Sequence, residues 1–159
     1  MKPSRFTEEQ IIALVKKAYA EGLQVRCRGA SHSVARAIYT DGDSPVPNKV
    51  LEQSPPQGPN INIMLDQYSR LTWIDEEEGI IEVESGINLG YDPEDPTGTS
   101  TLENSLLYQA FKKGWALEDL GGITHQTVAG FLSTGSSGGT LMYHLEKNLI
   151  GFRVIDGMG

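Results

Sequence analysis

The sequence predicts a domain that mixes helices with strands, of the α+β or the α/β class. Three observations predict this. Apolar residues recur at helical spacing in two segments, 11–19 and 102–111. Short β-type runs lie around them, at 23–28, 61–65 and 71–84. The chain has 159 residues, which is the size of one ordinary domain and enough to bury a core without disulfides.

The first predicted helix begins at a capping box. Thr7 and Gln10 fit the pattern S/T-x-x-E/Q, in which each end residue satisfies a backbone amide near the helix start. Apolar residues then repeat at helical spacing as far as Tyr19, and Gly22 is a natural stop. Apolar and polar residues alternate over 23–28, which predicts a half-buried strand.

The middle of the chain predicts a loop, a strand and a hairpin. Residues 41–60 are rich in Pro, Gly, Asn and Asp, which favours a loop. A short strand is predicted over 61–65. Two further strands, 71–74 and 80–84, flank the acidic segment 75–79 and read as a β-hairpin. We interpret the acidic segment as a solvated turn.

The last third predicts one more helix and one more strand. Ser100 and Glu103 form a second capping box after the loop 91–99. We expect the helix to run from there to Gly114, with an apolar face made by Leu102, Leu106, Leu107, Ala110 and Phe111. A glycine-dense loop over 121–139 follows, and a final strand is predicted over Leu149–Ile155.

Charge and composition exclude several classes of protein. The formal net charge is −8 and the isoelectric point is about 4.8, so nucleic-acid binding through a basic face is not expected. One cysteine, Cys27, excludes an intrachain disulfide, and we interpret it as a small strand residue. The first ten residues lack the apolar core of a signal peptide, and no apolar run approaches the ~20 residues of a membrane span. We expect a cytoplasmic protein or a processed mature chain.

Two loops carry the residue types of a phosphate-binding site. Gly29, Ala30, Ser31, His32 and Ser33 end the first strand, and their small side chains let backbone amides approach a pyrophosphate; a plain turn is the alternative. The loop 121–139 adds glycines and hydroxyl groups around an apolar stretch from Val128 to Leu132, which favours a ligand loop over a flexible linker.

Familiar alternatives fit less well. The chain has neither a Walker loop nor a G-x-G-x-x-G fingerprint. Residues 135–139 match G-x-S-x-G, but only His144 follows, too close to complete a nucleophile elbow. Histidines at 32, 125 and 144 lack zinc-type spacing.

Three segments together resemble one flavoprotein family. Residues 26–33, R-C-R-G-A-S-H-S, resemble the first pyrophosphate loop of the vanillyl-alcohol-oxidase superfamily, written R-x-x-G-x-G-H-S. Residues 120–135 resemble its second loop, the L-G-x-I-x-x-Q-T-V-x-G-x-x-x-T-G pattern of sugar-lactone and alditol oxidases. Residues 83–90 resemble its V-x-A-G-x-x-L-G segment, and the resemblance spans about 5–157.

The resemblance implies an α+β, PCMH-type FAD-binding domain built from two α+β subdomains. It places a complete first subdomain at about 1–68 and part of the second at about 69–159, with no substrate domain. We therefore expect a fragment, a processed chain or one piece of a split flavoprotein, with the rest of the protein or a partner chain completing it.

The resemblance also implies the residues that hold the FAD. His32 corresponds to the histidine that many members bond covalently to the flavin; a non-covalent histidine bonded to backbone is the alternative. Ser31 and Ser136-Ser137-Gly138 depart from the usual Gly and T-H-G, and a serine at 31 needs a negative φ or tolerates mild strain. The expected FAD-binding residues are Arg28, Gly29, Ala30, Ser31, His32, Ser33, Gly121, Gly122, Ile123, Gln126, Thr127, Val128, Gly130, Ser133, Thr134, Gly135, Ser136, Gly138 and Ile155.

The implied activity is oxidation of a hydroxyl-bearing carbon of a sugar, polyol or lactone by an FAD-dependent oxidase or dehydrogenase. The alternative is a flavin- or nucleotide-binding module without catalysis of its own. No general base is assigned, since Glu118 and Asp156 qualify only by residue type. We expect a small-molecule substrate, no nucleic-acid partner, no membrane span and no metal.

Overall fold

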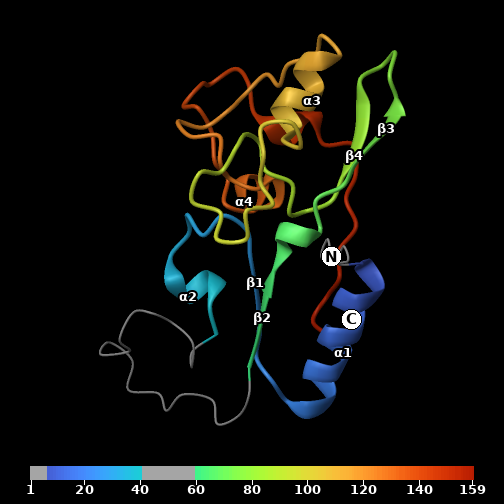
Figure 1. Ribbon diagram of the computed structural model, residues 1–159, viewed down its shortest axis with the longest axis vertical. Coiled ribbons are helices and arrows are strands. Elements are labelled where there is room, and N and C mark those ends of the chain that lie inside the picture. Colours follow the sequence, from blue (N-terminus) through green and yellow to red (C-terminus); the bar gives the residue numbers. More distant parts are fainter. Residues whose placement is uncertain (1–6, 41–59) are drawn as a thin grey trace.

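The computed structural model describes residues 7–40 and 60–159, and their fold is α+β. A parallel pair of strands and an antiparallel hairpin form two separate two-stranded sheets, with helices around them (Figure 1). The elements in chain order are α1 (Glu8–Glu21), β1 (Val25–Arg28), α2 (Ala35–Ile38), β2 (Ile61–Met64), the 3-10 helix η1 (Leu65–Gln67), β3 (Leu71–Asp75), β4 (Ile80–Val83), α3 (Leu106–Lys112), α4 (Val128–Ser133) and the 3-10 helix η2 (Leu145–Asn148).

Helix α1 confirms the prediction from its capping box. The Thr7 hydroxyl accepts a hydrogen bond from the amide of Gln10, and the Gln10 side chain accepts one from the amide of Thr7. Gly22 ends the helix in the left-handed conformation, with φ 66°, where glycine has no Cβ to clash. Local sequence therefore decides both ends of this helix.

The first hydrophobic core joins α1 to the parallel strands. Ile11 and Val15 of α1 are buried against Ile63 of β2, and Val25 of β1 packs beside them. The register pairs Val25 with Ile61 and Arg28 with Met64. Ile155, near the end of the chain, returns to this same core, where Figure 1 shows the last segment running beside α1.

The second hydrophobic core joins the hairpin to α3 and α4. Its buried residues include Ile87, Leu89, Leu106 and Phe131, and Val83 of β4 packs against them. The hairpin itself confirms the prediction, with Leu71 paired to Val83 and an irregularity between Trp73 and Asp75. Figure 1 shows this half above the β1–β2 pair.

Helix α3 begins later than predicted, and the predicted capping box at Ser100 is wrong. Ser105 is the N-cap residue, and its hydroxyl accepts a hydrogen bond from the amide of Tyr108. Ser100 instead accepts a hydrogen bond from the amide of Asp92 within the preceding loop. Because the helix starts at Leu106, Leu102 lies before it and is exposed.

The predicted final strand, Leu149–Ile155, is also wrong. Residues 149–155 have no strand assignment, and no strand in the described ranges pairs with them. Alternating apolar residues predicted a strand, but a strand forms only where a neighbour supplies hydrogen bonds. Phe152 and Val154 are exposed, while Arg153 forms an ion pair with Glu8 of α1, with 2.8 Å between its Nη1 and Oε2.

The predicted loop 121–139 contains a short helix, α4. Thr127 is its N-cap residue, and its hydroxyl accepts a hydrogen bond from the amide of Gly130. Val128 and Phe131 are buried in the second core, which explains the apolar stretch within the loop. The predicted loop 41–60 lies outside the described residues except for Asn60. Among the described helices, none is long and apolar enough to cross a membrane.

The close approach at Gly86 yields a test of this packing. A Cβ at Gly86 would lie 1.8 Å from the Leu65 carbonyl oxygen, which is backbone and cannot rotate away. We expect Gly86→Ala to lower the free energy of unfolding by about 2–3 kcal/mol. Gly151→Ala, where nothing lies within 4 Å, is the matched control and should change stability little. Equal urea denaturation midpoints for the two variants would contradict the described packing.

Candidate functional site

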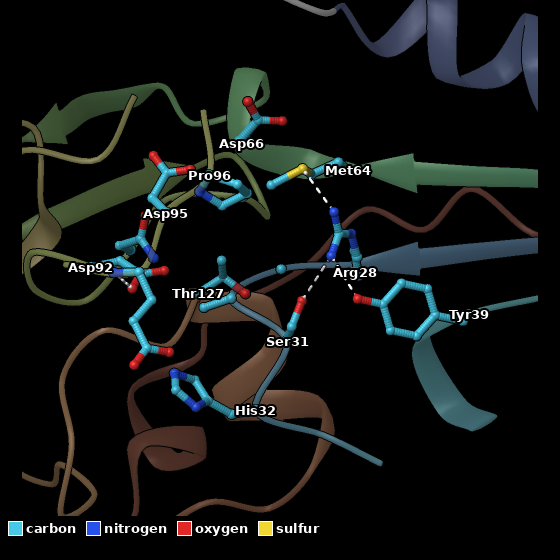
Figure 2. A pocket seen from close by; sticks show the side chains of 15 residues that line it. Arg28, Ser31, His32, Tyr39, Met64, Asp66, Asp92, Asp95, Pro96 and Thr127 are labelled. Carbon is cyan, nitrogen blue, oxygen red and sulfur yellow. Dashed lines mark hydrogen bonds between the residues drawn. The ribbon is translucent and has the colours of Figure 1, made fainter. Parts of the chain in front are cut away.

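A cleft of about 230 Å³ lies where the end of β1 meets the second half of the chain. Figure 2 shows Arg28 and Tyr39 on one side of Thr127, and Asp92 and Asp95 on the other. The lining residues are Arg28, Gly29, Ala30, Ser31, His32, Tyr39, Met64, Asp66, Gly86, Asn88, Asp92, Glu94, Asp95, Pro96 and Thr127.

Arg28 fixes the first loop from the last position of β1. Its guanidinium donates hydrogen bonds to the Tyr39 hydroxyl at 2.8 Å and to the Ser31 hydroxyl at 3.2 Å. The guanidinium carbon also lies 5.3 Å from the centre of the Tyr39 ring, a cation–π contact. Arg28 therefore connects Ser31 within the loop to Tyr39 at the end of α2.

The first loop has one feature of an anion-binding nest, a left-handed residue at Ser31. Ser31 has φ 62° and is the one described residue other than glycine with a positive φ. A left-handed residue between ordinary ones turns successive amides toward one side, which is the geometry of a nest. The amides of residues 29–33 donate no hydrogen bond to any described group. This run of amides is therefore free to bind the oxygens of a ligand.

The two predicted loops meet at Gly29 and Thr127. A Cβ at Gly29 would lie 2.1 Å from the Thr127 hydroxyl oxygen, so only glycine allows this approach. Thr127 also forms an isolated antiparallel bridge with Asn88, whose side-chain amide donates a hydrogen bond to the His125 carbonyl at 3.0 Å. The second loop is therefore anchored where it contacts the first, and the amides of 121–127 likewise have no acceptor in the described chain.

Two histidines, one from each loop, lie side by side. The ring centres of His32 and His125 are 4.5 Å apart, with the ring planes tilted by 58°. Nδ1 of His125 is buried without a hydrogen bond to any described group and lies 3.7 Å from Oδ1 of Asp92. His32 is exposed and lines the cleft, so a ligand there can reach its ring.

Four carboxyl groups line the cleft: those of Asp66, Asp92, Glu94 and Asp95. Asp95 is engaged with its own loop. Partial burial alone would raise its pKa, but hydrogen bonds from the amides of Ser100, Thr97 and Thr99 and from the Thr97 hydroxyl outweigh burial and lower the pKa from 3.8 to about 2. Asp95 therefore holds the loop 95–100 in shape.

The structure brings six of the predicted FAD-binding residues to the cleft: Arg28, Gly29, Ala30, Ser31, His32 and Thr127. Ser33 lies directly after them and is exposed. Val128 is buried in the second core and Ile155 packs on the first core, so neither side chain reaches the cleft. The remaining predicted residues do not line it: Gly121, Gly122, Ile123, Gln126, Gly130, Ser133, Thr134, Gly135, Ser136 and Gly138.

Several of those remaining residues brace the second loop. The Gln126 side chain donates a hydrogen bond to the Ser136 hydroxyl, which lies 2.9 Å from the Thr134 hydroxyl. The amide of Gly138 donates to Oδ1 of Asp119, a buried carboxylate whose Oδ2 has no hydrogen-bond partner in the described chain. These contacts hold the two ends of the loop together around α4.

Sequence reasoning missed the wall opposite the first loop. Asp92 and Glu94 line the cleft, although the segment 91–99 that contains them was predicted only as a loop. Asn88, which precedes this segment, lines the cleft as well. Tyr39, Met64 and Asp66 were also missed. The usable signal was Gly86, which belongs to the third resembling segment and itself lines the cleft. The two carboxylates named by residue type, Glu118 and Asp156, are exposed and do not line it.

Comparison with protein-family models gives no match, and comparison with curated proteins gives no match either.

The left-handed conformation at Ser31 yields a second prediction. A β-branched residue at this φ clashes with its own backbone, so we expect Ser31→Val to lower the free energy of unfolding by about 1–2 kcal/mol. Ser33→Val, two residues later and without a positive φ, is the control and should change stability much less. Thermal or urea unfolding checks this, and equal losses for the two variants would contradict the described loop.

The lowered pKa of Asp95 yields a third prediction, about pH. A carboxyl group whose folded pKa lies below its unfolded value stabilises the fold above the unfolded pKa, and the effect is lost as pH falls toward the folded pKa. The Asp95 contribution should thus be complete above about pH 4–5 and lost toward pH 2. We expect Asp95→Asn to destabilise the protein at pH 7 and to approach wild type near pH 2.

Urea unfolding across this pH range measures the difference between the two proteins. Glu77→Gln changes an exposed carboxylate in the turn between β3 and β4 and is the matched control. A gap between Asp95→Asn and wild type that stays constant from pH 7 to pH 2 would refute the role given to Asp95.

Proposed function

We propose that this chain is the FAD-binding part of an FAD-dependent oxidoreductase of the vanillyl-alcohol-oxidase superfamily, with a PCMH-type domain. The observation that carries the proposal is the contact of Gly29 with Thr127. Two segments that each resemble a pyrophosphate loop, far apart in the sequence, meet at this contact, and the cleft is lined by residues 29–32 of the first and by Thr127 of the second. Both carry runs of amides without acceptors in the described chain.

The free amides of residues 29–33 suit the pyrophosphate. The chain carries a net charge of −8, so its overall field does not attract a phosphate. Binding must come from donors at short range, and backbone amides in a nest supply them without side-chain entropy loss. Arg28 adds one positive charge at the cleft, held in place by Tyr39 and Ser31.

The carboxylates of the opposite wall suit hydroxyl groups rather than phosphates. A carboxylate accepts hydrogen bonds, and a dinucleotide of this kind carries ribityl and ribose hydroxyls that donate them. Asp66 and Glu94 line the cleft and provide such acceptors. Free amides thus line one side of the cleft, and carboxylates line the other. This arrangement would orient the ligand with its phosphates at Gly29–His32.

His32 is the residue proposed to carry the flavin covalently. It lines the cleft, is exposed, and has no hydrogen bond to any described group. Attachment would replace a C–H bond of the flavin 8α-methyl group and an N–H bond of the imidazole with one C–N bond. The step would release two electrons and two protons, and it would therefore require an oxidant such as dioxygen, which would be reduced to hydrogen peroxide.

The bound flavin would accept a hydride from a hydroxyl-bearing carbon of a sugar, polyol or lactone. The chain's own part is to bind and orient the cofactor, and the rest of the flavoprotein or a partner chain would supply the substrate site. A second candidate is a flavin- or nucleotide-binding module without catalysis. Neither Glu118 nor Asp156 lines the cleft, so neither is assigned as the base, and a measurement of turnover separates the two candidates.

The intact mass of the acid-denatured protein tests the proposal, with the visible spectrum recorded first. We expect a yellow protein that keeps a mass increment of one FAD after denaturation. His32→Ala should remain yellow when native, because the amides still bind the pyrophosphate, but should lose all colour on denaturation. His144→Ala, which changes a histidine away from the cleft, is the control and should keep the increment.

Each result decides a separate part of the proposal. Colour that wild type loses on denaturation would keep FAD binding and reject covalent attachment. A full-length product that is colourless and binds no added FAD would reject the flavoprotein assignment. Bound flavin without turnover of any sugar, polyol or lactone would favour the non-catalytic module.

A further inference from the structure

Three side chains from three segments lie next to one another in the order Asp92, His125 and His32, and the first and the last of them line the cleft. Asp92 comes from the loop before α3, His125 from the loop before α4, and His32 from the loop after β1. Oδ1 of Asp92 lies 3.7 Å from Nδ1 of His125, and the His125 ring centre lies 4.5 Å from that of His32. The carboxylate of Asp92 is thus buried, and the imidazole of His32 is exposed.

Asp92 is held in a fixed position. Its side chain is 7% exposed, and its amide donates a hydrogen bond to the Ser100 hydroxyl at 2.9 Å. Its Oδ1 accepts a hydrogen bond from the amide of Glu94 at 3.0 Å. A buried carboxylate held in this way cannot turn to solvent, so its charge acts on the nearest polar neighbour, His125.

Asp92 faces the buried Nδ1 nitrogen of the His125 ring. Nδ1 of His125 is buried and has no hydrogen-bond partner in the described chain, and an unsatisfied buried nitrogen is unfavourable. A proton on Nδ1 faces the carboxylate and is attracted by it, and a small movement would close the 3.7 Å gap to a hydrogen bond. With Nδ1 protonated, Nε2 is left as a proton acceptor.

We infer that Asp92 and His125 are positioning residues that make His32 a nucleophile. Asp92 holds His125 with its proton on Nδ1, and Nε2 of His125 accepts the proton that His32 releases when it bonds to an electrophile. The carboxylate at 3.7 Å then stabilises the His125 cation formed. This role serves the covalent attachment proposed above, but it depends on the three side chains alone and can be tested without flavin.

Reaction with diethyl pyrocarbonate isolates this step. One nitrogen of His32 attacks a carbonyl carbon of the reagent and forms an N–C bond, while the ethyl carbonate anion leaves. The proton on the other nitrogen passes to His125 and then to solvent, and ethyl carbonate decays to ethanol and carbon dioxide. Peptide mass spectrometry separates modified His32 from His125 and His144.

The first test is the tautomer of His125 by long-range proton–nitrogen NMR at neutral pH. The chain has three histidines, so all the ring nitrogens can be resolved. We expect His125 to carry its proton on Nδ1 in the wild-type protein and to shift toward the Nε2-protonated form in Asp92→Asn. A wild-type His125 protonated on Nε2 alone would overturn the inference.

The second test is the rate of His32 modification in matched variants. We expect the rate to fall about tenfold or more in Asp92→Asn and in His125→Gln. Asp92→Asn keeps the oxygen that accepts from Glu94, so the loop should retain its shape. Glu146→Gln, beside His144 and away from the cleft, removes a similar charge and should leave the rate near wild type.

The outcomes separate this inference from the proposed function. If Asp92→Asn and Glu146→Gln slow His32 equally, the effect is a general acidic field and the relay is rejected. Rates unchanged in both Asp92→Asn and His125→Gln would reject it as well, even in a protein that binds FAD. A relay demonstrated in a protein that never takes up flavin would support the inference and reject the proposed function. Circular dichroism of each variant confirms that it is folded.

Discussion

The missing Cβ of Gly29 is the constraint on which the site depends. A side chain there would occupy the space of the Thr127 hydroxyl, 2.1 Å away. Thr127 in turn caps α4 and bridges to Asn88, so the position of one hydroxyl is tied to a helix start and to the segment before α3. Gly29, Thr127 and Asn88 therefore meet at one place, and all three line the cleft.

Two hydrophobic cores hold the walls in place from behind. Ile11, Val15 and Ile63 fix α1 and β2 below the first loop. Val128 and Phe131 fix α4 behind the second loop. Hydrogen bonds of Arg28 shape the first loop, and those of Asp95 shape the loop 95–100 on the opposite wall. A site built in this way has its backbone donors arranged before a ligand arrives, which lowers the entropy cost of binding.

Sequence reasoning succeeded where the determinants are local. The Thr7 capping box and Gly22 decide α1 without help from the rest of the chain, and the hairpin of β3 and β4 follows from alternation on either side of an acidic turn. It failed where a choice depended on tertiary contacts. Both Ser100 and Ser105 can cap a helix, and the pairing of Ser100 with Asp92 decided between them. The same reason explains the missed acidic wall, since nothing in the segment 91–99 indicates that it faces residues 29–32.

Amide chemical shifts during titration with FAD test the central claim most directly. If the two loops form one pyrophosphate site, the amides of 29–33 and of 121–127 should shift together and saturate at the same FAD concentration, while those of the β3–β4 turn stay unchanged. Riboflavin, which lacks the pyrophosphate, should leave the amides of 29–33 unmoved at that concentration. Shifts confined to one loop, or equal responses to FAD and riboflavin, would contradict a shared phosphate site at Gly29 and Thr127.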